Sequence, residues 1–243
     1  HYANQLRVKV LDKLSEVYGI DTSDEALRKA VEEHNEICRL ITEIGEYRKE
    51  ENPRITGYEF HVLCVATYCC PKYLILDKLR ETAEELKTRE PDQKKNYRAK
   101  IVVVGSEMDD PDFTKLIEDS GALVVADRFC FGSMPGREEI ILNDEDDVLT
   151  QIALHYMKTS QCPRYMSHEK VQERRDYVKH LVDEYNADGV MYEQLKFCEY
   201  WGYERALASY VMSGDYVVPT AAVDRQYTAS ASGQLRTRVQ AFV

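Results

Sequence analysis

The stretch "KIVVVGSEMD" at residues 100–109 marks the point where the sequence changes its period. An unbroken apolar run ends at Gly105, and such a run is typical of a strand buried on both faces of a parallel sheet. The next segment, "DPDFTKLIEDSG", offers Asp110 as a helix cap, Pro111 at the first helical position and Gly121 at the end. A strand followed directly by a helix predicts an α/β fold.

Three further runs predict strands of the same sheet. They are "ALVVADRF" (122–129), "ADGVMYE" (187–193) and "YVVPTAAVDR" (216–225). Helical patterns lie between them at about 146–158 and at 167–186, where Ser167 is the expected cap, and further helices follow the third and fourth strands. Alternation of strands and helices implies βαβ units, so we expect a parallel sheet of about four strands.

The chain before this region follows a helical period instead. Ser23 is a suitable cap for a helix from about Asp24 to Glu51, and shorter helices are expected after it. We therefore predict a helical region over residues 1–96 and an α/β domain over residues 97–243. Because His1 runs directly into a helical pattern, we expect the helical region to continue a preceding N-terminal domain.

Composition excludes several classes of protein. The net charge of −11 argues against a sequence-independent nucleic-acid binder, which needs a surplus of Lys and Arg. No run is long and apolar enough for a membrane helix, and no signal segment opens the chain. The seven cysteines are irregularly spaced, unlike a secreted disulfide framework. We expect a soluble cytoplasmic protein whose cysteines are reduced thiols or metal ligands.

Two cysteines fall where the carboxyl ends of the predicted strands meet. Cys130 follows the second strand and Cys198 follows the third, just before a helix whose dipole favours a thiolate. The alternative is that both thiols pack as small apolar groups. Neither has a second cysteine two or three residues away, so a metal site would need ligands from distant sequence. Cys162, next to Pro163 in a loop, is a further candidate ligand, although a plain loop residue is the favoured interpretation.

The segment "DRQYTASASGQLRTRVQAF" at residues 224–242 is a candidate anion site. Small residues lead into a helix whose first N–H groups can hold a phosphate or a thioester oxygen, and arginines add positive charge. The alternative is an ordinary helix cap on an arginine-faced surface helix. The residues concerned are Ser230, Ser232, Gly233, Arg225, Arg236 and Arg238.

Three segments together resemble the superfamily of 2-hydroxyacyl-CoA dehydratase D-components and benzoyl-CoA reductases. They are "EDSGALVVADRFCFG" (118–132), "NADGVMYEQLKFCEYWGYERALASYVM" (186–212) and "VVPTAAVDRQYTASASGQLRTRVQAFV" (217–243). Within the superfamily, the run "WGYER" and the ending most resemble the B or C subunits of ATP-dependent benzoyl-CoA reductase. The resemblance covers about residues 98 to 243.

The resemblance implies a flavodoxin-like fold and a 4Fe-4S cluster. Three cysteines of one subunit are the usual ligands in this family, and the position of the third is Cys198 here. The other two ligands are expected in an N-terminal half that precedes these residues. Arg225, Gln226, Ser232 and Gln234 are the expected substrate contacts.

The function that the resemblance implies is reduction of benzoyl-CoA to a cyclic dienoyl-CoA. Electrons would come from ferredoxin, and the expected partners are a paralogous cluster-bearing subunit and ATP-hydrolysing activator subunits. One alternative is a 2-hydroxyacyl-CoA dehydratase subunit, which shares the fold and the cluster but eliminates water. Another is a non-catalytic electron-transfer or structural subunit, and a third is a plain α/β binding module in which Cys198 only packs.

Overall fold

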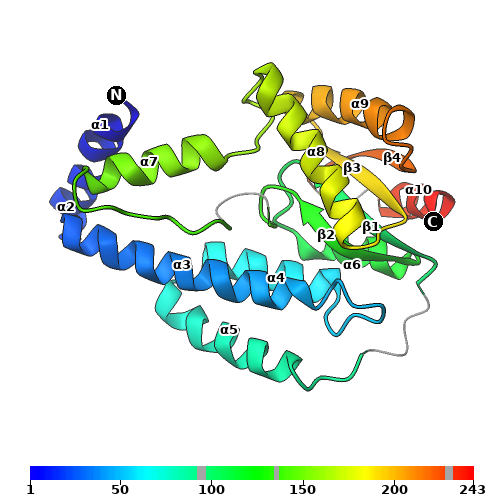
Figure 1. Ribbon diagram of the computed structural model, residues 1–243, viewed down its shortest axis with the longest axis horizontal. Coiled ribbons are helices and arrows are strands. Elements are labelled where there is room, and N and C mark those ends of the chain that lie inside the picture. The colour runs from blue at the N-terminus through cyan, green and yellow to red at the C-terminus, as the bar shows by residue number, and fades with distance from the viewer. Residues whose placement is uncertain (92–96, 134–136, 228–231) are drawn as a thin grey trace.

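The computed structural model describes residues 1–91, 97–133, 137–227 and 232–243, apart from the side chain of Ser232. Helices occupy one side of the molecule and a sheet with its own helices occupies the other (Figure 1). The helices before the sheet are α1 (Tyr2–Leu6), the π-helical stretch η1 (Arg7–Leu11), α2 (Asp12–Tyr18), α3 (Asp24–Glu46), α4 (Gly57–Cys69) and α5 (Lys72–Leu86).

Strands and helices alternate after residue 97, as predicted. The elements are β1 (Ala99–Gly105), α6 (Pro111–Asp119), β2 (Ala122–Arg128), α7 (Val148–Thr159), α8 (His168–Glu184), β3 (Gly189–Leu195), α9 (Glu199–Gly214), β4 (Thr220–Arg225) and α10 (Ser232–Phe242). The four strands are parallel and lie in the order β2-β1-β3-β4. This order is that of a flavodoxin-like sheet, so the predicted fold class is confirmed.

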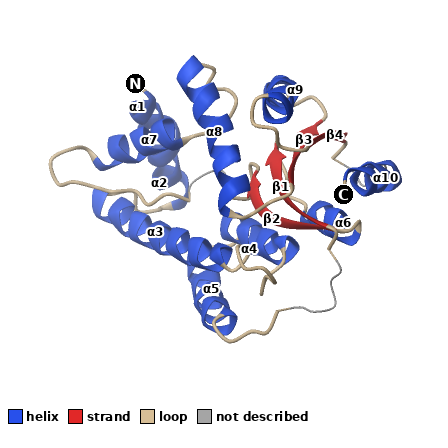
Figure 2. Cartoon of the chain, turned by 45° about the vertical axis from the view of Figure 1, so that its right-hand side comes forward, coloured by secondary structure: helices blue, strands red, loops and turns tan. Residues whose placement is uncertain are grey.

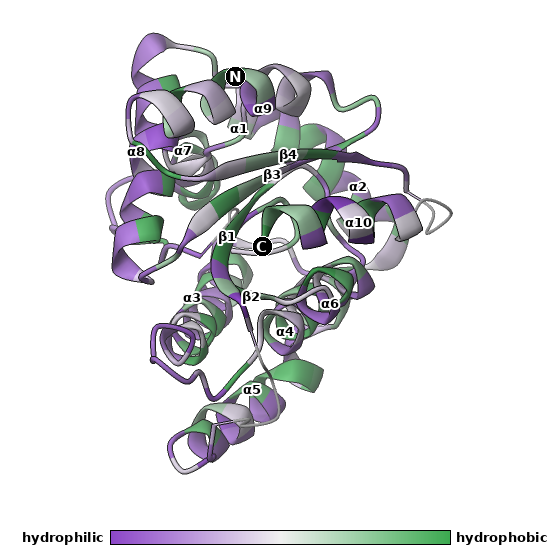
Figure 3. Cartoon of the chain, turned by 90° about the vertical axis from the view of Figure 1, so that its right-hand side faces the viewer, coloured by the Kyte–Doolittle hydropathy of each residue, from purple (hydrophilic) through white to green (hydrophobic). Residues whose placement is uncertain are grey.

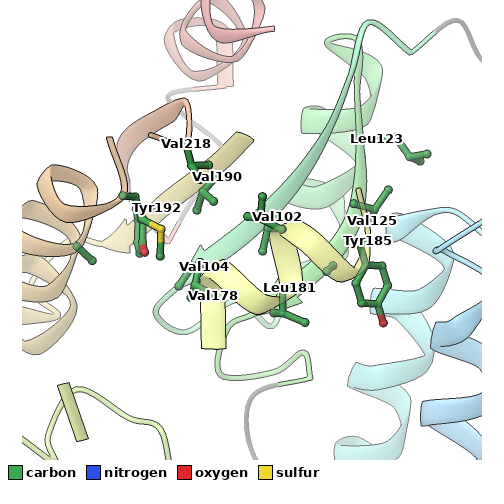
Figure 4. Close-up of a cluster of buried hydrophobic side chains, with 14 of the residues drawn as sticks. Val102, Val104, Leu123, Val125, Val178, Leu181, Tyr185, Val190, Tyr192 and Val218 are labelled. Carbon is green, nitrogen blue, oxygen red and sulfur yellow. The ribbon is translucent and has the colours of Figure 1, made fainter. Parts of the chain in front are cut away.

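Helices cover both faces of the sheet (Figure 2). On one face, side chains of α8 and α9 pack on alternate residues of the strands, among them Val102, Val104 and Tyr192 (Figure 4). On the other face, α6 and α10 pack on Ile101, Val103 and their neighbours. Hydrophobic residues gather along β1 and β3 in Figure 3, because both faces of these central strands are buried.

A separate core lies among the helices that precede the sheet. Ile41, Phe60 and Leu79 belong to it, one each from α3, α4 and α5. The later helix α7 packs against α3 and α1 (Figure 1). The molecule therefore has one apolar layer among helices and two on the faces of the sheet.

The predicted helix caps are formed. The hydroxyl of Ser23 accepts the N–H of Ala26 at the start of α3, and the hydroxyl of Ser167 caps α8 in the same way. The carboxylate of Asp110 caps α6. Within the described ranges, none of the helices combines the length and the apolar character that crossing a membrane requires.

The helix predicted to run from Asp24 to Glu51 ends earlier, at Glu46. Just after that point, Arg48 turns into the protein, where it pairs with Asp127 at 3.1 Å and stacks on Phe60 at 3.6 Å. A continued helix would have to give up this buried position. The early end therefore depends on tertiary contacts that no local pattern contains.

Candidate functional site

The carboxyl ends of the parallel strands meet at one edge of the sheet, as predicted. Gly105 at the end of β1 is in register with Glu193 of β3. The backbone N–H of Cys130 donates to the carbonyl of Ser106 at 3.1 Å. The backbone N–H of Lys196 donates to the carbonyl of Arg225 at 2.9 Å. The segments after all four strands are thus hydrogen-bonded to one another.

Glu193 is the centre of a buried polar network at this edge. Its carboxylate accepts the N–H and the hydroxyl of Ser106, both at 3.0 Å, and the guanidinium of Arg225 at 2.7 Å. Burial raises the pKa of Glu193, and the charge of Arg225 opposes this effect. The network fixes the relative positions of the segments after β1, β3 and β4.

Gly105 is required beside this carboxylate. A Cβ atom at this position would lie 2.5 Å from both the carbonyl oxygen and a carboxylate oxygen of Glu193. Only glycine permits so close an approach. The glycine that ends the first strand in the sequence is therefore a packing requirement of the network.

Cys198 lies at the start of α9, at the carboxyl end of β3. It is the N-cap residue and is half-buried, and Phe197 before it has a φ of +74°. Burial raises the pKa of the Cys198 thiol, whereas the nearby backbone N–H of Trp201 lowers it, although the thiol accepts no well-formed hydrogen bond as a helix cap. The arrangement suits a sulfur that becomes a thiolate when it binds a metal ion.

Two other thiols lie near Cys198. Burial raises the pKa of Cys130 to about 12, and the neighbouring thiols of Cys162 and Cys198 add to this effect. Cys130 and Cys198 also pack against the same apolar cluster. The sequence predicted Cys162 as a plain loop residue, and no local signal shows that the loop before α8 returns to this edge.

The described part of the chain does not contain a complete single-ion metal site. No group of three or more His, Cys, Asp or Glu side chains is arranged there to hold a metal ion. As a thiolate, Cys198 would supply one ligand to an iron-sulfur cluster, whereas burial raises the pKa of Cys130 to about 12 and keeps it a neutral thiol. The described residues therefore fit one corner of such a cluster.

The predicted substrate contacts lie in different environments. Arg225 is 6% exposed, and its guanidinium is held by Glu193 and by the carbonyl of Glu107. Gln226 and Gln234 are exposed. The side chain of Ser232 lies outside the described residues.

The remaining residues of the predicted anion site are also placed differently from one another. Arg236 is exposed, Arg238 pairs with Asp224 at 3.4 Å, and Ser230 lies outside the described residues. Part of the expected positive charge is therefore neutralised by a neighbouring carboxylate.

A cavity of about 750 Å³ opens beside the carboxyl end of β2, between the sheet and the helices α3, α4, α7 and α8. Its wall contains the buried pair of Arg48 and Asp127, together with Arg128 and Arg137. Apolar and aromatic side chains such as Phe60, Met157 and Tyr177 line it as well, together with further polar residues. The size and the mixed wall are those of a small-molecule site. No local sequence pattern indicates this cavity, because its wall comes from six separate elements, α1, α3, α4, β2, α7 and α8.

Comparison with known proteins places these features in a family. The chain matches, over residues 1–243, the family described as 2-hydroxyglutaryl-CoA dehydratase, D-component. It is 23% identical over 234 residues to the (R)-phenyllactyl-CoA dehydratase beta subunit of Clostridium sporogenes, covering 96% of this chain and 60% of that protein. It is 25% identical over 234 residues to the putative dehydratase subunit YjiM of Escherichia coli (strain K12), covering 95% and 60%. The chain thus spans 60% of the length of these curated relatives. Since the family match extends over every residue, the chain belongs to the 2-hydroxyglutaryl-CoA dehydratase D-component family.

Proposed function

We propose that this chain is part of a cluster-bearing subunit of a complex that acts on CoA thioesters, and that Cys198 supplies one thiolate to a 4Fe-4S cluster. The observation that carries the proposal is the position of this thiol. It is half-buried at the carboxyl edge of a flavodoxin-like sheet, at the start of a helix, with the backbone N–H of Trp201 near its sulfur. When bound, such a cluster supplies one-electron transfer.

The protein's own residues hold this sulfur in place. The side-chain amide of Gln194 donates to the carbonyl of Cys198 at 3.2 Å, and the network of Glu193, Ser106 and Arg225 fixes the end of β3. Partial burial excludes water from one side of the thiol. The remaining cluster ligands come, in this proposal, from other parts of the protein or complex.

The reaction that we propose first is dehydration of a 2-hydroxyacyl-CoA. The family description and the printed names of both relatives support it, since each names a dehydratase. The second candidate is reduction of benzoyl-CoA to a cyclic dienoyl-CoA with electrons from ferredoxin. The run "WGYER" at Trp201–Arg205 favours this candidate by its resemblance to the reductase subunits. A third role is electron transfer or structural support without substrate contact.

The proposed partners follow from the same family. One relative is named as a beta subunit and the other as a dehydratase subunit, which supports a second, paralogous subunit here. We also propose ATP-hydrolysing activator subunits and ferredoxin as electron donors, and the cytoplasm as the location. Assembly of the purified protein with candidate subunits, followed by gel filtration, tests the first of these partners.

Removing the thiol tests the cluster proposal directly. In the anaerobically purified complex, Cys198→Ser should lose most of its iron and acid-labile sulfide, because a hydroxyl is a poor ligand for this cluster. The matched control is Cys70→Ser, since Cys70 is an exposed cysteine that is far from Cys198 in the sequence. Iron and sulfide analysis gives the readout. Equal iron in both variants would overturn the role of Cys198.

The choice between the two reactions needs a separate assay. The complete complex is incubated with a 2-hydroxyacyl-CoA and with benzoyl-CoA, and ferredoxin oxidation is recorded. Loss of water without net consumption of reduced ferredoxin supports dehydration. Stoichiometric ferredoxin oxidation with benzoyl-CoA contradicts it and establishes reduction.

The position of the substrate is tested with side-chain variants. We propose that Gln226 and Gln234 contact the thioester and that Arg225 only positions them, because its guanidinium is already engaged. Gln226→Ala and Gln234→Ala should raise KM for the acyl-CoA, while the exposed Gln172→Ala on α8 should not. If KM instead rises for Met157→Trp, which narrows the cavity of about 750 Å³, the acyl group lies there.

A further inference from the structure

A second, much smaller cavity lies between the sheet and the helices α8 and α9. It has about 10 Å³ of space for the centre of a water-sized particle. A cavity that leaves this much room for the centre of such a particle has space for one water molecule or one small ion. The wall consists mostly of buried side chains, namely Val104, Arg128, Gln161, Arg174, Arg175, Val178, Tyr192, Trp201 and Glu204.

Four of these side chains carry a polar atom without a hydrogen-bond partner among the described residues. The atoms are the Nε of Arg128, the Nε of Arg174, the hydroxyl of Tyr192 and the indole Nε1 of Trp201. The four residues are 8%, 5%, 1% and 3% exposed, so solvent cannot satisfy these atoms. Leaving a buried donor unpaired costs about 1–3 kcal/mol each. So many unpaired groups around one cavity point to a bound acceptor.

Trp201 is placed between two features. Its backbone N–H lies near the sulfur of Cys198, whereas its indole lines the small cavity. The indole N–H lies near the sulfur of Cys130 but makes no well-formed hydrogen bond with it, and a thiol sulfur is a weak acceptor. The indole donor is therefore available to a stronger acceptor in the cavity.

The wall also has a surplus of positive charge. It contains three guanidinium groups and one carboxylate, Glu204, which pairs with Arg174 at 3.0 Å and with Arg175 at 3.2 Å. Asp127, the carboxylate next to Arg128 in the chain, pairs with Arg48. Arg128 itself donates to the carbonyl of Ser133 at 3.0 Å and stacks on Tyr177 at 4.5 Å, but no carboxylate forms an ion pair with it among the described residues.

We propose that this cavity binds a single monatomic anion of the size of chloride. Three of the four unpaired atoms are N–H groups that can only donate, and the fourth is a hydroxyl that can donate. A halide accepts several hydrogen bonds and neutralises part of the charge, whereas a water molecule accepts two and brings no charge. The inference is independent of the proposed function, because it uses neither the cluster nor a CoA thioester.

Trp201 reports on the site, since it is the only tryptophan in the chain. The purified chain is titrated with sodium chloride at constant ionic strength, with gluconate as the replacing anion, and tryptophan fluorescence is recorded. Chloride and bromide should produce a saturable change, and sulfate, which is too large for the cavity, should not. A flat response to chloride, or an equal response to sulfate, would overturn the proposal.

A single donor can be removed with little change of shape. Tyr192→Phe should weaken the apparent chloride affinity about tenfold, because a hydrogen bond to a charged group is lost. The control is Tyr210→Phe, since the ring of Tyr210 is 78% exposed on the outer side of α9. Equal chloride affinities of Tyr192→Phe and the control would contradict the assignment.

Crystallography in bromide gives a test that does not depend on any variant. Crystals of the chain grown in sodium bromide should show an anomalous peak in the cavity, beside Tyr192 and Trp201. An ordinary water at that position, without anomalous signal, would show that the cavity holds solvent and would reject the anion.

Discussion

At the scale of single residues, Glu193 connects the elements that carry the candidate site. It is fully buried and binds groups from the ends of β1 and β4. A carboxylate in such a place is stable only while its partners remain, since an unpaired buried charge is strongly unfavourable. The position of Cys198, five residues further along, depends on this anchor.

Glu193→Gln should therefore reduce the free energy of unfolding by about 3 kcal/mol, because Arg225 keeps its buried charge without a carboxylate to neutralise it. The matched control is Glu145→Gln, at an exposed glutamate of the loop before α7. Urea unfolding followed by circular dichroism provides both values. A loss no larger than that of the control would show that Arg225 finds another partner.

At the scale of elements, the start of α4 is fitted tightly against β2. The carboxylate of Glu118 accepts the N–H groups of Gly57 and Tyr58 at 2.8 and 3.2 Å, and that of Val124 at 3.3 Å. A negative charge at a helix N-terminus is favourable, so this contact both caps α4 and attaches it to the strand. Because Gly57 has no side chain, the start of α4 can come this close to β2.

Gly57→Ala should destabilise the protein by about 2 kcal/mol, because an added Cβ would lie 2.5 Å from both the Cβ and the carbonyl oxygen of Val124. Gly214→Ala is the matched control, since nothing lies within 4 Å of a Cβ at that position in α9. It should be neutral, or stabilising by up to about 1 kcal/mol. Thermal unfolding of the two variants compares them, and equal midpoints would contradict the tight fit.

At the scale of the whole molecule, buried polar contacts join the helical layer to the sheet. The pair of Arg48 and Asp127 links the end of α3 to β2. The ring of His61 in α4 is 1% exposed and is hydrogen-bonded at 2.8 Å to the hydroxyl of Thr114 and to the carbonyl of Met108. Both partners of His61 lie beyond the first strand, so the two layers form one packed body.

His61 gives this junction a pH dependence. Burial lowers the pKa of its imidazole from the ordinary value of 6.5, so below that pH the unfolded chain binds a proton that the folded protein does not. Stability should therefore fall as the pH drops below about 6.5. His61→Gln should show a shallower fall, whereas His168→Gln, at the exposed start of α8, should keep the slope. Urea unfolding across this pH range measures the slope of stability against pH. An unchanged slope in His61→Gln would contradict the role of His61.

The sequence by itself determined the elements of this protein. The strands at Ala99–Gly105 and Ala122–Arg128, and the caps at Ser23 and Asp110, follow from local patterns, because apolar period, caps and glycines act over only a few residues. The convergence of the segments after the strands, with Cys198 at a helix start, also followed, since parallel strands bring their carboxyl ends to one edge.

Only the tertiary structure decided which side chains meet. It turned Arg48 inward and ended α3 early, engaged Arg225 with Glu193, and brought Cys162 near Cys130 and Cys198. It also formed both cavities from elements that are far apart in the chain. These outcomes depend on the path by which the long loops return to the sheet. They also depend on which buried charges pair with one another. Such choices are energetic and long-range, and no repeat of three or four residues encodes them.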